Sequence, residues 1–290
     1  MNKDVFNIIK SKYDDMSKGH KRIADYLLEN YQKASFMTAA SLGQIVGVSE
    51  STVVRFATEL GYEGYPEFQD NLREIMKVRL TSAQRIEVAS SMMRDEDVYE
   101  KVMSLDIERI RNTIENGDRA AFAGSVEAIA GARRIYIVAS RSAAAPAAFL
   151  KYYLSIMFED VKLLSNLGTS DLLQGLFRVG EDDIVIGLSF PRYSKQTTIA
   201  MDFCSERKAK VIAITDSMSS PIARNAKYVM TAGSDMVSFA DSLVAPMSLI
   251  NALIVAVSLK KQDEINQSFD TLEHIWDEYD VYEKSDNEQR

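Results

Sequence analysis

AASLGQIVGVSESTVVRFATELG, residues 39–61, decides the first half of the fold, because it predicts two short helices joined by a tight turn. Gly47 permits the chain reversal, Ser49 is placed to cap the second helix, and Gly61 is expected to end that helix with a left-handed cap. Apolar residues at helical spacing are expected to face the core: Leu42, Ile45, Val46, Val48, Val53, Phe56, Ala57 and Leu60. Together these features predict a helix-turn-helix.

The opposite face of the second helix carries short polar side chains and one cation. With the cap residue Ser49, we expect Ser51, Thr52 and Arg55 to lie near the helix start, where base edges are met in the DNA major groove. The alternative is an ordinary helical hairpin without a nucleic-acid role. Turn, cap, core and exposed polar residues together favour DNA binding.

Composition indicates a globular protein of two domains, with 290 residues, of which 46% are hydrophobic and 26% charged. No apolar run reaches the roughly 18 residues that span a bilayer, and the first residues lack the pattern of a secretory signal. Cys204 is the only cysteine, so no internal disulfide can form, and its apolar helical surroundings predict a buried thiol. We therefore expect a cytoplasmic protein.

Charge argues against a protein that simply coats nucleic acid, since the net charge is −8. Residues 1–77 hold 10 Lys and Arg against 11 Asp and Glu, a net charge of −1. DNA binding would then need a local basic patch and two copies of the chain acting together. The candidates for the patch are Lys18, Lys21, Arg22, Lys33 and Arg55.

The first domain, residues 1–80, is predicted to be all-α. Helices are expected over 5–13, 18–30, the two helices of the quoted stretch, and 65–78. Residues 81–91 are polar and predict a connection, and 95–115 shows helical spacing. We assign 81–131 to a linker with connecting helices.

The period of the pattern changes in residues 132–290. Short apolar runs over 135–138, 161–164, 184–188, 211–214 and 228–230 alternate with helix-length segments, and helices over 241–260 and 264–279 end the chain. This alternation predicts an α/β domain with a five-stranded parallel sheet flanked by helices. The helix over 241–260 has apolar residues in excess of what one sheet face needs, which suggests a dimer interface: Leu243, Met247, Ile250, Leu253, Ile254 and Val257.

Ligands of open parallel sheets bind at the carboxyl ends of the strands, where loops lead into helix starts. Two such loops combine hydroxyls with arginine, a pairing that suits phosphate. The candidate ligand-binding residues are Ser140, Arg141 and Ser142 in the first loop, and Ser189, Arg192, Tyr193, Ser194 and Thr197 in the second. The alternative is that Ser142 and Ser194 merely cap their helices.

A third loop, 215–221, is expected to be structural, with Ser220 as a cap and Pro221 in a first helical turn. Asp182 and Asp183 precede a strand on the side opposite the expected pocket and are expected to be solvated.

Residues for catalysis are sparse. His20 and His274 are the two histidines, so no histidine cluster can hold zinc, and none falls between residues 21 and 273. The loop after the first strand contains no glycine, so dinucleotide and phosphate-loop signatures are missing. We expect no catalytic residue, no metal and no cofactor.

The chain resembles the RpiR family of bacterial transcription regulators over nearly its whole length. In the first domain the resemblance rests on residues 21–30, Gly47-Val48-Ser49, residues 52–56, Leu60-Gly61 and residues 65–68. In the second it rests on the strand pattern and on residues 209–216 and 220–223, which look like a sugar isomerase (SIS) domain, the phosphosugar-binding module of this family.

The resemblance implies a homodimer or homotetramer that binds operator DNA and responds to a phosphorylated sugar or sugar acid. Ser51, Thr52 and Arg55 then fall on the recognition helix, and Ser189, Ser194 and Thr197 in the phosphate loop.

Two departures from the family pattern concern this ligand site. Pro191-Arg192-Tyr193 replaces a small, glycine-containing stretch, and Ala139 and Arg141 stand where glycines are common. One hypothesis is that Arg141 or Arg192 contacts a phosphate or carboxylate. The competing one is that Arg192 blocks the phosphate position and leaves a domain used for assembly.

Three functions follow from these observations. The first is a transcriptional regulator of carbohydrate metabolism, without enzyme activity. The second is a SIS-domain phosphosugar isomerase or lyase with an accessory helical domain, which would need a positioned base that the histidine distribution does not offer. The third, an assembly scaffold, leaves the polar face of the helix-turn-helix unexplained.

Overall fold

The structure, a computed structural model, describes residues 5–93, 97–235 and 239–283. It divides into two compact units, one of residues 1–104 with 235–242 and one of residues 105–234 with 243–290. The division falls inside helix α7 (Val98–Asn116).

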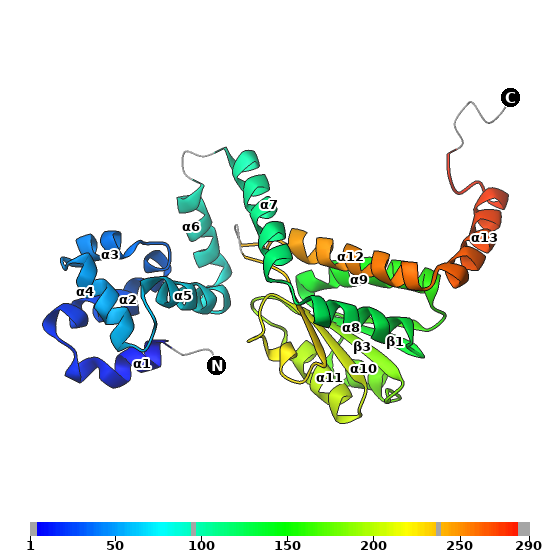
Figure 1. Cartoon of the computed structure of the whole chain (residues 1–290), viewed down its shortest axis with the longest axis horizontal. Helices are drawn as coiled ribbons and strands as arrows, with labels where there is room; N and C mark the ends of the chain where they lie inside the picture. Colours follow the sequence, from blue (N-terminus) through cyan, green and yellow to red (C-terminus); the bar gives the residue numbers. More distant parts are fainter. Residues whose placement is uncertain (1–4, 94–96, 236–238, 284–290) are drawn as a thin grey trace. The chain divides into compact units, whose positions relative to one another are not determined.

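The first unit is helical (Figure 1), as the sequence predicted. Its helices are α1 (Val5–Lys12), α2 (Lys18–Ala34), α3 (Ala39–Val46), α4 (Glu50–Glu59), α5 (Tyr65–Arg79) and α6 (Ser82–Met92), with a short 3-10 turn at Tyr13–Asp15. Their core is aromatic around Phe56, Phe68 and Tyr62, which meet edge to face. The α4 residues predicted to face inward are buried: Val53, Phe56, Ala57 and, just after it, Leu60.

The prediction that Ile45 faces the core is wrong, since this residue is 53% exposed. The buried face of α3 runs through Ala39, Leu42, Gly43 and Val46. A Cβ added at Gly43 would lie 2.8 Å from the carbonyl oxygen of Val48. Backbone contact at Gly43 therefore sets the rotation of α3, and that rotation turns Ile45 to solvent.

Residues 81–91 also differ from expectation, because most of this segment is helix α6 rather than a connection. Its start is a capping box: Gln84 N donates to Thr81 Oγ1 at 3.3 Å, and Thr81 N donates to Gln84 Oε1 at 3.0 Å. Arg85 is 1% exposed and bonds Asp241 at 2.6 Å within the same unit. A cap and a buried ion pair thus support a helix that the apolar pattern did not reveal.

The second unit is built on five parallel strands, as predicted: β1 (Arg134–Ala139), β2 (Val161–Ser165), β3 (Asp183–Leu188), β4 (Lys210–Thr215) and β5 (Tyr228–Thr231). Their order is β2-β1-β3-β4-β5. The chain therefore adds β2 on one side of β1 and the later strands on the other, so the topology switches between β1 and β3.

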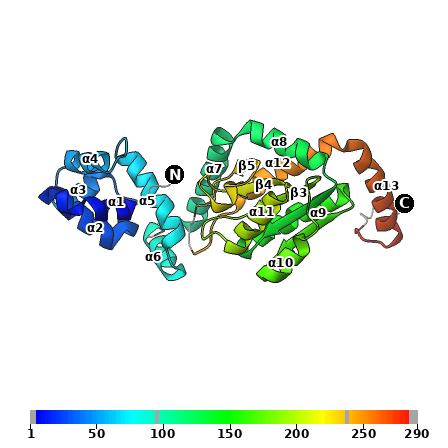
Figure 2. The ribbon, with the colours of Figure 1, turned by 90° about the horizontal axis from the view of Figure 1, so that it is seen from below.

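Helices cover both faces of this sheet (Figure 2). One face packs on α8 (Arg119–Ala130), α9 (Ala144–Met157) and α12 (Val244–Lys260), and the other on α10 (Thr169–Leu176) and α11 (Lys195–Glu206). Two further short 3-10 turns, Arg141–Ala143 and Pro221–Ala223, and helix α13 (Gln262–Glu278) complete the unit.

Asp183, expected to be solvated, is instead fully buried at the amino end of β3. Its carboxylate accepts hydrogen bonds from Arg133 and Arg134 at 3.1–3.2 Å and from the Gly180 amide at 2.9 Å. A buried carboxylate needs such partners, and Arg133, just before β1, and Arg134, its first residue, supply them. Asp182 is exposed. As predicted, Asp182 and Asp183 lie at the amino end of β3, on the side of the sheet away from the carboxyl ends of the strands.

Helix α12 is apolar on more than one face. Four of the residues predicted for a dimer interface belong to the unit's own core: Ile250, Leu253, Ile254 and Val257. The apolar surplus lies elsewhere on the helix, where Val244, Val255 and Leu259 are 40%, 49% and 70% exposed.

Among the described residues, no single helix has the length and hydropathy to cross a membrane, and only α12 and α13 together, across a 97° bend, pass that test.

Candidate functional site

The turn between α3 and α4 has the predicted geometry. Gly47 ends α3 in the left-handed conformation (φ 69°), Ser49 Oγ accepts from Thr52 N at 3.3 Å, and Gly61 follows α4 with φ 90°. Val48 is partly buried against the helical core. The local sequence thus fixes how α4 is presented.

The four residues predicted to bind DNA form one connected group at the amino end of α4. Ser49 Oγ lies 2.9 Å from Ser51 Oγ and 2.8 Å from Thr52 Oγ1. Arg55 donates through Nη2 to Thr52 Oγ1 at 3.4 Å. Ser49, Ser51 and Arg55 are exposed and Thr52 is half-buried. Hydroxyls, a guanidinium and helix-start amides are the groups that contact phosphates and base edges.

Two of the remaining basic candidates lie beside this group. Arg22 donates through Nη1 to the Gly47 carbonyl at 3.0 Å, and a Cβ added at Gly19 would lie 3.5 Å from Thr52, so the first turn of α2 adjoins that of α4. Lys18 is exposed in that turn.

The other two candidates are not part of the patch. Lys21 donates to the Asp14 carbonyl at 3.0 Å, and Lys33 lies at the far end of α2. The patch is therefore narrower than the sequence suggested.

His20 of α2 packs against the buried side of α4. It is buried, its Nδ1 lies 2.8 Å from Glu59 Oε2, and its ring meets Phe56 edge to face at 5.6 Å. These contacts fasten α2 to α4.

At the carboxyl edge of the sheet, the loops after β1 and β3 flank the point where the strand order reverses. Ligands of open α/β sheets bind at such a switch point. Both loops with candidate ligand-binding residues, 140–142 and 189–197, lie at this point. The two segments are 47 or more residues apart in sequence, and the topology brings them to one edge.

In the first loop, Arg141 has a left-handed backbone (φ 59°), is exposed, and donates its amide to Asn166 Oδ1 at 2.7 Å. Ser140 precedes the 3-10 turn Arg141–Ala143 without a side-chain cap, and Ser142 lies inside it. Ser142 therefore caps no helix, because this extra turn moves the start of α9 to Ala144. Asn166, which follows β2, was missed by the sequence reasoning.

In the second loop, Ser194 caps α11 by accepting from Thr197 N at 3.3 Å, as predicted. Ser189 Oγ accepts from Ser194 N at 3.2 Å. Arg192 is exposed and left-handed (φ 62°). The loop thus carries an exposed arginine two residues before the cap of α11.

Thr197 is fully buried in the first turn of α11, and its Oγ1 has no hydrogen-bond partner in the part of the chain that the structure describes. The same holds for Ser220 Oγ, which is 2% exposed. Buried hydroxyls are almost always hydrogen-bonded, so Thr197 and Ser220 retain capacity for a further group. Ser220 occupies the predicted cap position without a side-chain cap bond, and Pro221 opens the following 3-10 turn, as expected.

The loop after β4 braces the loop after β3. Thr215 Oγ1 donates to the Ser189 carbonyl at 2.7 Å, and Tyr193 Oη donates to Asp216 Oδ1 at 3.0 Å. Tyr193 thus has a structural partner on one side of the candidate pocket. Asp216 had been assigned only to a structural loop, and spacing alone did not indicate this pairing.

Cys204 is buried in α11, and burial raises the pKa of its thiol to about 12. His274 is exposed on α13. No group of three or more His, Cys, Asp or Glu side chains suited to a metal ion occurs among the described residues.

Family models match both units. The helix-turn-helix domain of the rpiR family matches residues 3–77, and the SIS domain matches residues 128–256. An uncharacterized HTH-type transcriptional regulator of Haemophilus influenzae is 26% identical over 232 residues, 79% of this chain and 80% of that protein. The HTH-type transcriptional regulator HexR of Pseudomonas aeruginosa is 23% identical, over 89% of this chain and 90% of its own length.

Solved structures agree with the fold. The sugar isomerase domain of an RpiR transcription factor from Sphaerobacter thermophilus superposes with a TM-score of 0.59 and 28% identity, covering 61% of this chain and 98% of that one. The Vibrio vulnificus NanR protein complexed with ManNAc-6P gives a TM-score of 0.57 at 20% identity, covering 94% and 98%.

Proposed function

The chain belongs to the RpiR family of transcriptional regulators, and on that premise we propose that a phosphorylated sugar or sugar acid controls its binding to operator DNA. The observation that carries the proposal is the meeting of the two arginine- and hydroxyl-bearing loops at the β1/β3 switch point. Ser49, Ser51, Thr52 and Arg55 would contact the DNA.

On the effector side, Ser194 and Thr197 offer hydroxyls at the start of α11, where phosphate binds well. Ser189 lies in the same loop and accepts from Ser194 N, and Ser140 and Ser142 lie in the loop after β1 at the same edge of the sheet. Arg141 and Arg192 are exposed at the rim and would each add a charged fork for a phosphate or carboxylate. That NanR is described in complex with ManNAc-6P supports a sugar phosphate as the class of effector.

The competing interpretation is that Arg192 closes the phosphate position and leaves a domain used for assembly. The unpaired Thr197 hydroxyl argues against it, because a degenerate site would gain by satisfying that group. We propose that Tyr193 belongs to the wall of the pocket, fixed there by Asp216.

The chain is proposed to regulate rather than catalyse. The relatives described above are named as regulators, and the isomerase or lyase alternative needs a base near the carboxyl ends of the strands. Asp216, which lies there, is occupied by the Tyr193 hydroxyl.

Operator binding requires two recognition helices in successive major grooves, with half-sites about one helical turn apart. We therefore propose a homodimer or homotetramer in the cytoplasm, supported by the exposed apolar residues of α12. The effector must prefer one arrangement of the DNA-binding units, because equal affinity for both would shift nothing. The division into residues 1–80, 81–131 and 132–290 is proposed as the functional one.

The test is a mobility shift with the full chain on DNA from upstream of its own gene and the adjacent genes. It is run with and without a panel of phosphorylated sugars and sugar acids. We expect a specific shift that one compound strengthens or releases. A salt-sensitive smear indifferent to sequence and ligand would contradict the proposal.

Two variants separate the sites. Arg55→Ala should weaken operator binding by about 10-fold or more, since a bidentate base contact contributes about 1–3 kcal/mol, and should leave effector affinity unchanged. Arg192→Ala should weaken the effector by a similar factor, since a charged hydrogen bond contributes about 1.5–3 kcal/mol. Unchanged effector affinity in Arg192→Ala would exclude that guanidinium from the site.

A further inference from the structure

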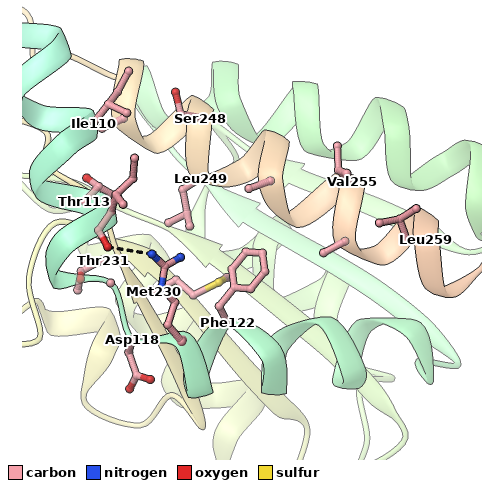
Figure 3. A pocket seen from close by; sticks show the side chains of 16 residues that line it. Ile110, Thr113, Asp118, Phe122, Met230, Thr231, Ser248, Leu249, Val255 and Leu259 are labelled. Atoms are coloured by element: carbon pink, nitrogen blue, oxygen red, sulfur yellow. Dashed lines mark hydrogen bonds between the residues drawn. The ribbon is translucent and has the colours of Figure 1, made fainter.

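The second unit contains an apolar groove that begins beside the carboxyl end of β5, the edge strand away from the β1/β3 switch point (Figure 3). Its volume is about 540 Å³, and its walls come from α7 (Ile110, Ile114), α8 (Phe122) and α12 (Leu249, Val255, Leu259). Asp118 and Arg119 are the charged residues of its lining, and they offset one another. Neither the operator surface nor the effector loops account for this groove.

Helix α13 and the residue after it carry an apolar stripe that their own chain covers only in part. Ile265 is buried, whereas the stripe beyond it is exposed or half-buried at alternating spacings of four and three residues: Phe269, Leu272, Trp276 and Tyr279. Trp276 meets only other α13-region aromatics among its described ring contacts, Phe269 and Tyr282. A heptad spacing of this kind is the pattern of a helix that packs on another helix.

Helix α13, called the arm below, does not lie in the groove of its own chain. α13 turns 97° away from α12 and contacts α9, which flanks α12 on the side away from α8 and the groove. The arm projects from the end of the second unit (Figure 1). Packing on α9 leaves Phe269 and Tyr279 of the stripe exposed, so the stripe can still accept a partner helix.

Charge distinguishes two partners that a second copy of the chain could offer to α13, namely its α13 helix and its groove. α13 holds six acidic residues and no Lys or Arg: Asp263, Glu264, Asp270, Glu273, Asp277 and Glu278. Two arms placed side by side would repel one another. The groove is apolar with offsetting charges, and Arg119 is exposed at its edge. α12 and α13 are both 17 residues, about 25 Å, so one arm matches the groove in length.

We infer that the α13 stripe of one chain occupies the α7/α8/α12 groove of a second copy, and that the exchange is reciprocal. A reciprocal exchange is isologous and closes a dimer. The inference rests on the proposed homo-oligomer and specifies its interface.

The chain offers a clean background for a cross-linking test, because Cys204 is its one thiol and is fully buried. Two differently tagged full-length chains are co-expressed, one with Leu272→Cys on the arm and one with Val255→Cys in the groove, and the mixed oligomer is oxidised. We expect a disulfide that joins the two differently tagged chains. The matched control is Gln267→Cys, exposed on the opposite side of α13, which should cross-link far less.

Four outcomes would overturn the inference. One is cross-linking of Leu272→Cys with itself, which would mean arm-to-arm pairing. Another is an intramolecular link in a chain that carries both substitutions. The third is no link in protein that sediments as a dimer, which would leave the proposed regulator intact. A protein that sediments as a monomer would contradict both the exchange and the proposed oligomer.

Trp276 is the single tryptophan and supplies a second measurement. Leu259→Glu places a charge in the groove at a residue that is 70% exposed, so the fold of the chain should survive. We expect a red shift of the tryptophan emission together with loss of the dimer. Asn251→Glu, exposed on α12 outside the groove, should change neither. Unchanged emission in a Leu259→Glu dimer would exclude the exchange.

Discussion

The two units of the chain use left-handed backbone in opposite ways. The helical unit places glycine at its left-handed positions, Gly47 and Gly61, on either side of α4. The sheet unit places Arg141 and Arg192 there, at the switch point. A side chain in this conformation costs about 1–2 kcal/mol that glycine avoids. In the first unit the turn serves to aim a helix, and in the second the side chain on the turn is itself what is presented.

Lys208 sharpens this comparison. It is also left-handed (φ 62°), but it lies in the turn between α11 and β4, at the amino end of the strands. Left-handed backbone alone therefore does not identify a site. The difference lies in where the turn stands relative to the β1/β3 switch point.

The largest effect is expected at Gly43, where the helical unit needs glycine for space. In Gly43→Ala the new Cβ would lie 2.8 Å from the Val48 carbonyl, so α3 must shift and the unit should lose about 1–3 kcal/mol. Denaturant unfolding measures the loss. Gly180→Ala is the control, since nothing lies within 4 Å of its added Cβ. Equal stability of both variants would disprove the close approach.

Next come the two serine caps, which share one geometry at 3.3 Å. Ser49→Ala and Ser194→Ala should each cost about 1 kcal/mol in thermal or urea unfolding. Their binding phenotypes should diverge, with operator affinity lost in the first and effector affinity in the second. If Ser194→Ala loses stability but keeps effector affinity, Ser194 is a cap alone.

A smaller effect of opposite sign is expected from Arg192→Gly. Removal of the left-handed strain gains about 1–2 kcal/mol and the chain entropy of glycine costs about 0.5–1 kcal/mol, so the chain should gain about 0.5–1 kcal/mol while effector affinity falls. Lys208→Gly should give the same gain and keep effector affinity. The same unfolding and titration measurements check both variants, and an unchanged titration for Arg192→Gly would remove the contrast between the two units.

The last effect is absent near neutral pH and appears only at alkaline pH. Burial raises the pKa of Cys204 from 9.0 to about 12 and that of Tyr65 from 10.0 to about 12. Both shifts favour the neutral side chain in the folded chain. The stability that they contribute is therefore complete below pH 9 for Cys204 and below pH 10 for Tyr65, and it is lost as pH rises toward 12. The sheet unit should therefore weaken first.

Urea unfolding at pH 8 to 11 follows this loss, with Cys204→Ala and Tyr65→Phe as variants that flatten it. The folded chain should also resist a thiol reagent at pH 8. Rapid labelling of folded protein would contradict a buried thiol.

The helix-turn-helix follows from the amino-acid sequence alone, because each of its signals is local. Gly47, Ser49 and the 3.6-residue spacing of Val53, Phe56 and Leu60 act within a few residues of one another. The five strands were equally readable, since a parallel sheet buried on both faces leaves continuous apolar runs. The order of the strands, and hence the switch point, was not written in any one run.

Which side chains meet in the folded protein follows from tertiary contacts, because these contacts join groups far apart in the chain. The Gly43 approach to Val48 turned Ile45 outward, and Arg133 and Arg134 supplied the partners that the buried Asp183 needs. Asn166 and Asp216 joined the effector loops through hydrogen bonds that no spacing encodes. The stripe on α13 was visible as periodicity, but the 97° bend that keeps it from its own chain's groove is a property of the folded unit. Local signals fix elements, and long-range packing fixes which side chains meet.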